Sequence, residues 1–197
     1  MDQRELWDAE AATFDDEADH GLADPATREA WRALLLGVLP PAPARIADLG
    51  CGTGSLSVLL AREGYAVDGL DLSPEMVARA RAKADAAGVS VDLTVGDAQA
   101  PGLPPASYDV VLSRHVLWAM DDPALALDRW LALLASGGTL LLVEGSWSTG
   151  AGITAAQAAT LVRGTGREAD VRLLPEPVYW GKEITDERYL LVSASPR

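Results

Sequence analysis

The sequence predicts an α/β fold: a doubly wound, mostly parallel sheet of seven strands with an antiparallel last strand, preceded by a helical lid. Two observations indicate this fold. Between residues 45 and 146, short apolar runs rich in β-branched residues alternate with runs of helical spacing. A glycine-rich run, DLGCGTG at 48–54, stands between the first apolar run and the first helical one. We expect a lid over residues 1–43 and a core over 44–197.

The N-terminal region is predicted to be helical and to lie outside the sheet. Over residues 3–19 apolar side chains recur at helical spacing opposite an acidic face, at Trp7, Ala11, Phe14 and Ala18. Asp24 followed by Pro25 is typical of an N-cap residue with proline at the first helical position, so a second helix is expected to begin there. The proline-rich run LPPAPA at 39–44 then leads into the core.

Within the core, most of the expected strands are separated by helices. Strands are expected at 45–50, 65–72, 89–97, 108–115, 139–146, 170–174 and 187–194. Helices are expected at 53–64, from Ser73 to Gly88, from Asp122 to near Gly138, and at 153–163. No long helix separates the last two strands, so we expect them to form a hairpin that places one antiparallel strand in the sheet.

Composition and charge argue against several classes of function. The net charge of −13 would repel a phosphate backbone, so no nucleic-acid partner is expected. The single cysteine excludes an internal disulfide and a cysteine-cluster zinc site, and no other metal motif stands out. The N-terminus is acidic, unlike a signal peptide, and no apolar run reaches the roughly 18 residues of a membrane span. We expect a cytoplasmic protein without a membrane partner, either monomer or homodimer.

Glycines and acids at the predicted strand ends indicate a nucleotide site. The glycines at 50, 52 and 54 allow a ligand to approach the backbone closely. Asp71 ends the second strand about 20 residues after the first glycine, where a carboxylate accepts both ribose hydroxyls. Asp97 ends the third strand, where it is placed to meet an adenine amino group. The alternatives are a surface acid for Asp71 and a turn-forming acid for Asp97.

The spacing of the glycines separates two kinds of nucleotide. A dinucleotide fingerprint has the spacing G-x-G-x-x-G and binds a pyrophosphate at a helix N-terminus. Here the spacing is G-x-G-x-G, and Asp48 precedes the first glycine. A carboxylate at that place favours a ligand with a cationic amino-acid end over a pyrophosphate. An NAD-binding protein remains an alternative.

In combination, these runs resemble the class I S-adenosylmethionine (SAM) methyltransferases. The resemblance spans about residues 44–146 and rests on DLGCGTG (48–54), GLDLS (69–73), GDA (96–98), YDVVLSRHVLW (108–118) and LLASGGTLLLVE (133–144). It implies the Rossmann-like methyltransferase fold and SAM as cofactor. The short, acidic chain with its aromatic N-terminal region favours a small-molecule acceptor, and a composition rich in Ala, Arg, Asp and Gly favours secondary metabolism. The product would be S-adenosylhomocysteine (SAH). The alternatives are a SAM-binding enzyme of cyclisation or decarboxylation and a non-catalytic SAM-binding partner protein.

The resemblance also implies the residues that bind the cofactor. Asp71 would take the ribose hydroxyls, Asp97 the adenine amino group, and Asp48 would help to hold the amino group of the methionyl part. The full predicted set is Asp48, Gly50, Cys51, Gly52, Gly54, Asp71, Leu72, Gly96, Asp97, Ala98, Ser113 and Arg114. For Cys51 the alternatives are a small buried thiol and a nucleophile, and for Arg114 a salt bridge to one of the many acids.

Two histidines are the candidate catalytic residues. His115 directly follows the fourth strand and is predicted to be a general base or to orient the acceptor, with a structural histidine as the alternative. His20 is the second candidate, with a helix C-cap as its alternative. We expect the lid and the loops after the strands to form an aromatic substrate cavity, although core packing is the alternative for the tryptophans. Its predicted lining is Trp7, Phe14, His20, Trp31, His115, Trp118 and Trp147.

Overall fold

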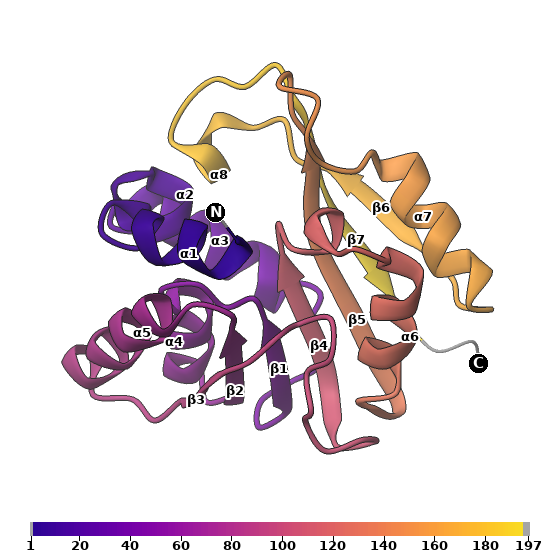
Figure 1. Cartoon of the computed structure of the whole chain (residues 1–197), viewed down its shortest axis with the longest axis horizontal. Coiled ribbons are helices and arrows are strands. Elements are labelled where there is room, and N and C mark those ends of the chain that lie inside the picture. The colour runs from indigo at the N-terminus through magenta and orange to yellow at the C-terminus, as the bar shows by residue number, and fades with distance from the viewer. Residues whose placement is uncertain (1, 195–197) are drawn as a thin grey trace.

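The computed structural model describes residues 2–194 and has a seven-stranded sheet at its centre (Figure 1). The strand order is β3-β2-β1-β4-β5-β7-β6. Strands β1 to β5 run parallel to one another, whereas β7 runs antiparallel to β5 and β6, as predicted. The strands are β1 (Arg45–Leu49), β2 (Ala66–Asp71), β3 (Asp92–Val95), β4 (Tyr108–Arg114), β5 (Leu134–Ser146), β6 (Asp170–Leu173) and β7 (Glu187–Ser193).

Helices cover both faces of the sheet. One buried cluster joins one face to α3, α4 and α8, and a second joins the other face to α6 and α7. Figure 1 shows α4 and α5 on one side of the sheet, α6 and α7 on the other, and α1, α2 and α8 together at one end. The helices of these layers are α3 (Pro25–Leu36), α4 (Ser55–Arg62), α5 (Pro74–Ala87), α6 (Pro123–Leu131), α7 (Ala155–Gly164) and α8 (Pro177–Trp180). The doubly wound fold is therefore confirmed.

The predicted starts of the helices are confirmed by their caps. The carboxylate of Asp24 accepts a hydrogen bond from the Thr27 N–H, and the Ser73 hydroxyl accepts one from the Met76 N–H. Helix α6 ends at Leu131, earlier than expected, because the chain enters β5 already at Leu134. Within residues 2–194, no helix combines the length and the apolar character needed to cross a membrane.

The first predicted helix is interrupted, and the prediction of one helix over 3–19 is wrong. The chain instead forms α1 (Gln3–Glu10), η1 (Phe14–Asp16) and α2 (Ala18–Gly21). The interruption brings Asp15 to the Thr53 hydroxyl, which donates to it at 2.5 Å, and to the Lys83 ammonium at 2.9 Å. These tertiary contacts override the helical spacing of the sequence.

Helix α3 packs as a layer of the core. Trp31 is fully buried in the cluster that contains Ile46 and Leu141 of the sheet. Its indole Nε1 donates to the Tyr179 carbonyl at 2.8 Å, and its ring meets Trp180 edge-on with the centroids 5.4 Å apart. Both partners belong to α8, a four-residue helix that the sequence pattern did not predict. The packing thus joins α3 to the sheet and leaves residues 3–21 outside the two helical layers.

Replacing Trp31 with phenylalanine is expected to lower the free energy of unfolding by about 1–3 kcal/mol, because the buried Tyr179 carbonyl loses its donor. Urea denaturation followed by circular dichroism measures this change. Val178→Ala on α8, whose side chain is 42% exposed, is the control and should change stability by no more than about 0.5 kcal/mol. Equal losses in the two variants would contradict the role given to this hydrogen bond.

Candidate functional site

A cavity of about 430 Å³ lies beyond the carboxyl ends of β1, β2 and β4. The strand order reverses between β1 and β4, which is where ligands bind in open sheets of this kind. Its volume lies within the range of about 300–1,000 Å³ that is typical of small-molecule sites. Most of the predicted site residues line it, from six separate segments of the chain: Trp7, Phe14, His20, Asp48, Gly50, Cys51, Gly52, Asp71, Leu72, Asp97, Ala98, Arg114, His115, Trp118 and Trp147.

Four of the predicted site residues do not line the cavity. Trp31 lies in the core under α8. Gly54 starts α4 with a positive φ and packs on α5, where an added Cβ would lie 2.8 Å from the Ala80 Cβ. Gly96 packs against Leu70 in the same way, and the buried Ser113 hydroxyl donates to the Leu49 carbonyl at 3.1 Å. Gly54 thus allows α4 and α5 to pack closely, and Gly96 and Ser113 pack against the strands behind the cavity.

The glycine turn after β1 is tied to the end of β2. The Leu70 carbonyl accepts hydrogen bonds from the Gly50 N–H at 2.8 Å and from the Cys51 N–H at 2.9 Å. Gly50 has a φ of +72°, and a Cβ there would lie 2.3 Å from Val116 Cγ2, so only glycine fits. The Gly52 N–H donates to Asp71 Oδ2 at 2.8 Å. The turn and the carboxylate of β2 are therefore held as one unit.

Burial raises the pKa of three groups that line the cavity, Asp48, Cys51 and Asp71. Burial raises the pKa of Asp71, which is partly offset by N–H donors, and raises the pKa of Asp48 to about 6. Ser57 donates to Asp48 at 2.5 Å. Burial also raises the pKa of the Cys51 thiol well above its ordinary value. A thiol kept protonated in this way fits the small buried residue and argues against a nucleophile.

The loop that follows β4 is held by a buried acid that the sequence analysis missed. His115 has a positive φ of 61°, and its N–H donates to the Val143 carbonyl at 2.8 Å. Glu144 is fully buried in β5, and its Oε1 accepts hydrogen bonds from the N–H groups of Val116 at 3.0 Å and Leu117 at 2.7 Å. Burial raises the pKa of Glu144 to about 8. In the sequence, an acidic residue inside the apolar run TLLLVEGS is the feature that indicates such a buried carboxyl group.

Aromatic rings surround the side chain of His115. Its ring meets Trp147 edge-on at 5.2 Å between centroids and lies nearly parallel to Trp180 at 6.0 Å. The Trp118 indole donates to the His115 carbonyl at 3.0 Å. Burial lowers the pKa of His115 well below its ordinary value, so the imidazole is neutral near pH 7.

A second aromatic group comes from the N-terminal segment. Phe14 stacks on His20 with the ring centroids 4.2 Å apart and meets Trp7 edge-on at 6.4 Å. Burial also lowers the pKa of His20, against the opposing charge of Asp19. Trp7, Phe14 and His20, which the sequence analysis predicted to line a substrate cavity, therefore line the same cavity as His115.

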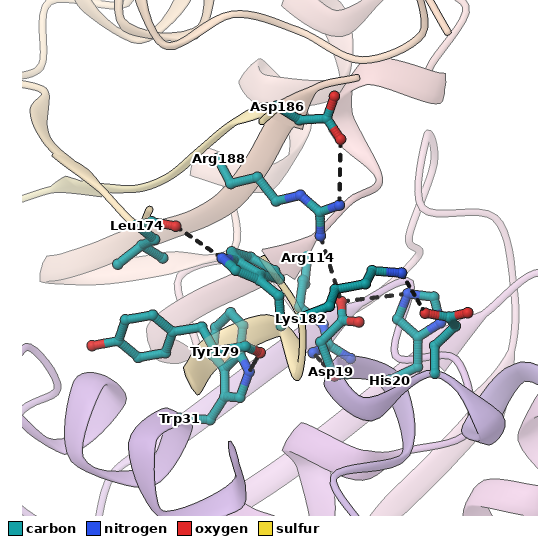
Figure 2. Close-up of polar contacts among 11 residues, drawn as sticks. Asp19, His20, Trp31, Arg114, Leu174, Tyr179, Lys182, Asp186 and Arg188 are labelled. Carbon is teal, nitrogen blue, oxygen red and sulfur yellow. Dashed lines mark hydrogen bonds and ion pairs between the residues drawn. The ribbon is translucent and has the colours of Figure 1, made fainter. Parts of the chain in front are cut away.

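Asp19 also lines the cavity, next to His20 (Figure 2), and was not predicted. Its side chain is 3% exposed, and its Oδ2 lies 3.6 Å from His20 Nε2. Asp19 Oδ2 and His115 Nε2 are both buried without a hydrogen-bond partner among residues 2–194. One ligand atom each from Asp19, His20 and His115 lie within 4.8 Å of one another, a donor set that suits a metal ion although the sequence predicted none.

Basic side chains flank this cluster. The Arg114 guanidinium donates to the Asp19 carbonyl, and Arg188 Nη1 lies 4.0 Å from Asp19 Oδ2 (Figure 2). At the rim, Lys182 pairs with Glu17 at 2.8 Å. Arg188 and Lys182 follow α8 in a segment without a recognisable motif, so no pattern in the sequence pointed to them.

Comparisons with known proteins agree with this geometry. Residues 47–142 match the family described as "Methyltransferase domain". The ubiquinone biosynthesis O-methyltransferase of Xylella fastidiosa (strain 9a5c) is 35% identical over 149 residues, which cover 74% of this chain and 56% of that protein. The chain thus spans just over half the length of the curated relatives it matches.

Two solved structures show the same fold. The cyclase SpnF has a TM-score of 0.74 at 22% identity, covering 85% of this chain and 80% of that chain. Magnesium protoporphyrin IX methyltransferase (ChlM) from Synechocystis PCC 6803, solved with bound SAM, has a TM-score of 0.68 at 22% identity, covering 86% and 78%. Together with the matched domain and the sequence relatives, the fold and the glycine turn lead to one conclusion: the chain belongs to the class I SAM-dependent methyltransferases.

Proposed function

We propose that this protein transfers the methyl group of SAM to a hydroxyl oxygen of a small aromatic acceptor. The observation that carries the proposal is a single cavity with Asp71 and the glycine turn at its floor and rings around His115 in its wall. The name of the Xylella relative, an O-methyltransferase, supports oxygen as the methylated atom. The similarity to the cyclase SpnF concerns the fold alone and does not favour cyclisation.

The floor of the cavity fits the predicted cofactor residue by residue. The oxygens of Asp71 each accept one backbone N–H, from Gly52 and Ser73, and each has a further lone pair for a ribose hydroxyl. Asp97 with Leu72 and Ala98 is proposed to hold the adenine. Asp48 is proposed to hold the ammonium of the methionyl end, and Arg114 its carboxylate.

Bound SAM supplies a methyl group on a positively charged sulfur, which is already an activated leaving group. The rings around His115 would exclude water and restrict the orientation of the acceptor beside the imidazole. The acceptor oxygen would form its bond to the methyl carbon as the carbon–sulfur bond breaks, with SAH as the leaving group. The neutral His115 takes the hydroxyl proton at Nε2, which is buried and has no other partner among residues 2–194.

Residues 3–21 are proposed to act as a lid, and we call them the lid segment. They supply Trp7, Phe14 and His20 to the cavity. Polar contacts fasten the segment to the core: the Ser73 hydroxyl donates to Asp8, and Lys83 and Lys182 pair with acids of the segment. A lid that opens and closes would admit the ligands and then exclude water from the reaction.

Replacing Asp71 with asparagine is expected to weaken SAM binding about 10- to 100-fold, because the ribose loses a charged acceptor. Isothermal titration calorimetry measures the affinity. Asp92→Asn on the neighbouring strand β3 removes an exposed carboxylate outside the cavity and should leave the affinity unchanged. Equal affinities for wild type and Asp71→Asn would remove Asp71 from the proposed site.

The proposed activity is tested by SAH formation with a panel of phenols and catechols, read by mass spectrometry. His115→Ala is expected to lower kcat by about 100-fold or more while the SAM affinity stays the same, because general-base catalysis typically contributes that much. In the wild type, kcat at saturating SAM should be level from pH 7 upward and fall only in acid, since the lowered pKa keeps His115 neutral.

His115→Asn, which keeps a polar side chain without the base, should be as slow as the alanine variant. Wild-type turnover in either variant would make His115 a structural residue. Failure of the wild type to form SAH from any member of the panel, with SAM bound, would contradict methylation at a phenolic oxygen.

A further inference from the structure

The Nε atom of the buried Arg188 guanidinium makes no hydrogen bond within the described part of the chain. The Arg188 side chain is 9% exposed and lines the cavity. The Nη1–Asp19 Oδ2 and Nη2–Asp186 Oδ2 distances are 4.0 Å and 3.7 Å, both longer than an N–H···O hydrogen bond (Figure 2). A guanidinium has five N–H donors, and a buried charge left without hydrogen bonds is destabilising.

Packing, rather than hydrogen bonding, fixes the position of this side chain. Arg188 Cζ lies 4.5 Å from the centroid of the Trp180 ring. Trp180 is itself buried, and its indole donates to the Leu174 carbonyl at 2.8 Å (Figure 2). The guanidinium therefore rests on a fixed ring, and its donors remain available to a ligand in the cavity.

Two further unpartnered polar atoms lie in the wall of the same cavity. Asp19 Oδ2 and His115 Nε2 are buried without hydrogen bonds among residues 2–194. Both side chains belong to the group, with His20, whose ligand atoms lie within 4.8 Å of one another. Native proteins leave few buried polar groups unsatisfied. Three such groups, from α2, the β4 loop and β7, therefore indicate a polar group of a ligand at this place.

The charge of the flanking side chains decides which kind of ligand fits. A divalent cation on Asp19, His20 and His115 would lie beside the Arg188 guanidinium, which is 4.0 Å from Asp19 Oδ2, and near Arg114. A carboxylate would instead pair with the fork of Arg188, for which two parallel N–H···O bonds are the preferred geometry. The site therefore suits an anionic oxygen group better than a metal ion.

We propose that Arg188 binds a carboxylate of the acceptor, and that the hydroxyl to be methylated sits beside it and faces His115 Nε2. The acceptor class is then an aromatic hydroxy acid. The proposal deepens the function proposed above and rests on it, because it assumes that this part of the cavity holds the acceptor. Asp19 stays beside the guanidinium as its counter-charge.

The test uses the full chain saturated with SAH and two probes of similar shape, salicylate and its neutral amide, salicylamide. Calorimetry is expected to show salicylate binding about 10-fold or more tightly than salicylamide. Arg188→Gln should abolish this preference. Arg172→Gln on the adjacent strand β6 removes an exposed arginine outside the cavity and should preserve it. Arg188→Lys, which keeps the charge but not the fork, should give an intermediate ratio.

Affinity for SAH, measured in every variant, separates the possible failures. If the wild type binds SAH but binds both probes equally, or neither, the Arg188 subsite is wrong and the proposed methyl transfer is untouched. If the wild type does not bind SAH, the proposed function itself fails. If Arg188→Gln does not fold, the ratio in Arg188→Lys decides. Zinc that binds the wild type, is lost in Asp19→Asn and competes with salicylate would show a metal site and overturn the proposal.

Discussion

The Leu70 carbonyl, which accepts N–H groups from both Gly50 and Cys51, is the contact on which the site depends. It joins the turn after β1 to the end of β2, so that the Asp71 carboxylate lies against the Gly52 N–H. The joint requires glycine at residue 50, since a side chain there would collide with Val116. The floor of the cavity is therefore held by the backbone hydrogen bonds to the Leu70 carbonyl together with the bond from the Gly52 N–H to the Asp71 carboxylate.

A buried carboxyl group holds the wall of the cavity that the loop after β4 forms. Glu144 is an acid within an otherwise apolar strand, and it fixes the loop of His115 by accepting two backbone N–H groups. Burial raises its pKa to about 8, so the carboxyl is largely protonated at neutral pH. A neutral acid at this place anchors the loop without burying a full negative charge in the apolar strand. The floor and this wall are thus held by strands of one sheet. Residues 3–21 supply a further part of the cavity lining.

Features with a local signal were predictable, and features created by tertiary contact were not. The strands, the capped helices and the acids at the strand ends each follow from a few neighbouring residues, and Asp48, Asp71 and Asp97 do line the cavity. The break in the predicted helix 3–19 depends on contacts of Asp15 with residues far along the chain. Arg188 and Asp19 meet only because β7 enters the sheet next to β5. Trp31 does not line the predicted cavity, because its side chain packs under α8, a helix of only four residues.

The way in which the lid segment is fastened has a consequence for ligand exchange. Its ion pairs, Glu17 with Lys182 and Asp15 with Lys83, lie at or near the surface. Such pairs contribute at most about 1 kcal/mol each and are screened over roughly 8 Å at physiological ionic strength. In the proposed lid motion, these two pairs therefore contribute little to the free-energy difference between the closed and open forms. Added salt should shorten the residence time of a bound product, so ionic strength becomes a control on how fast the cavity empties.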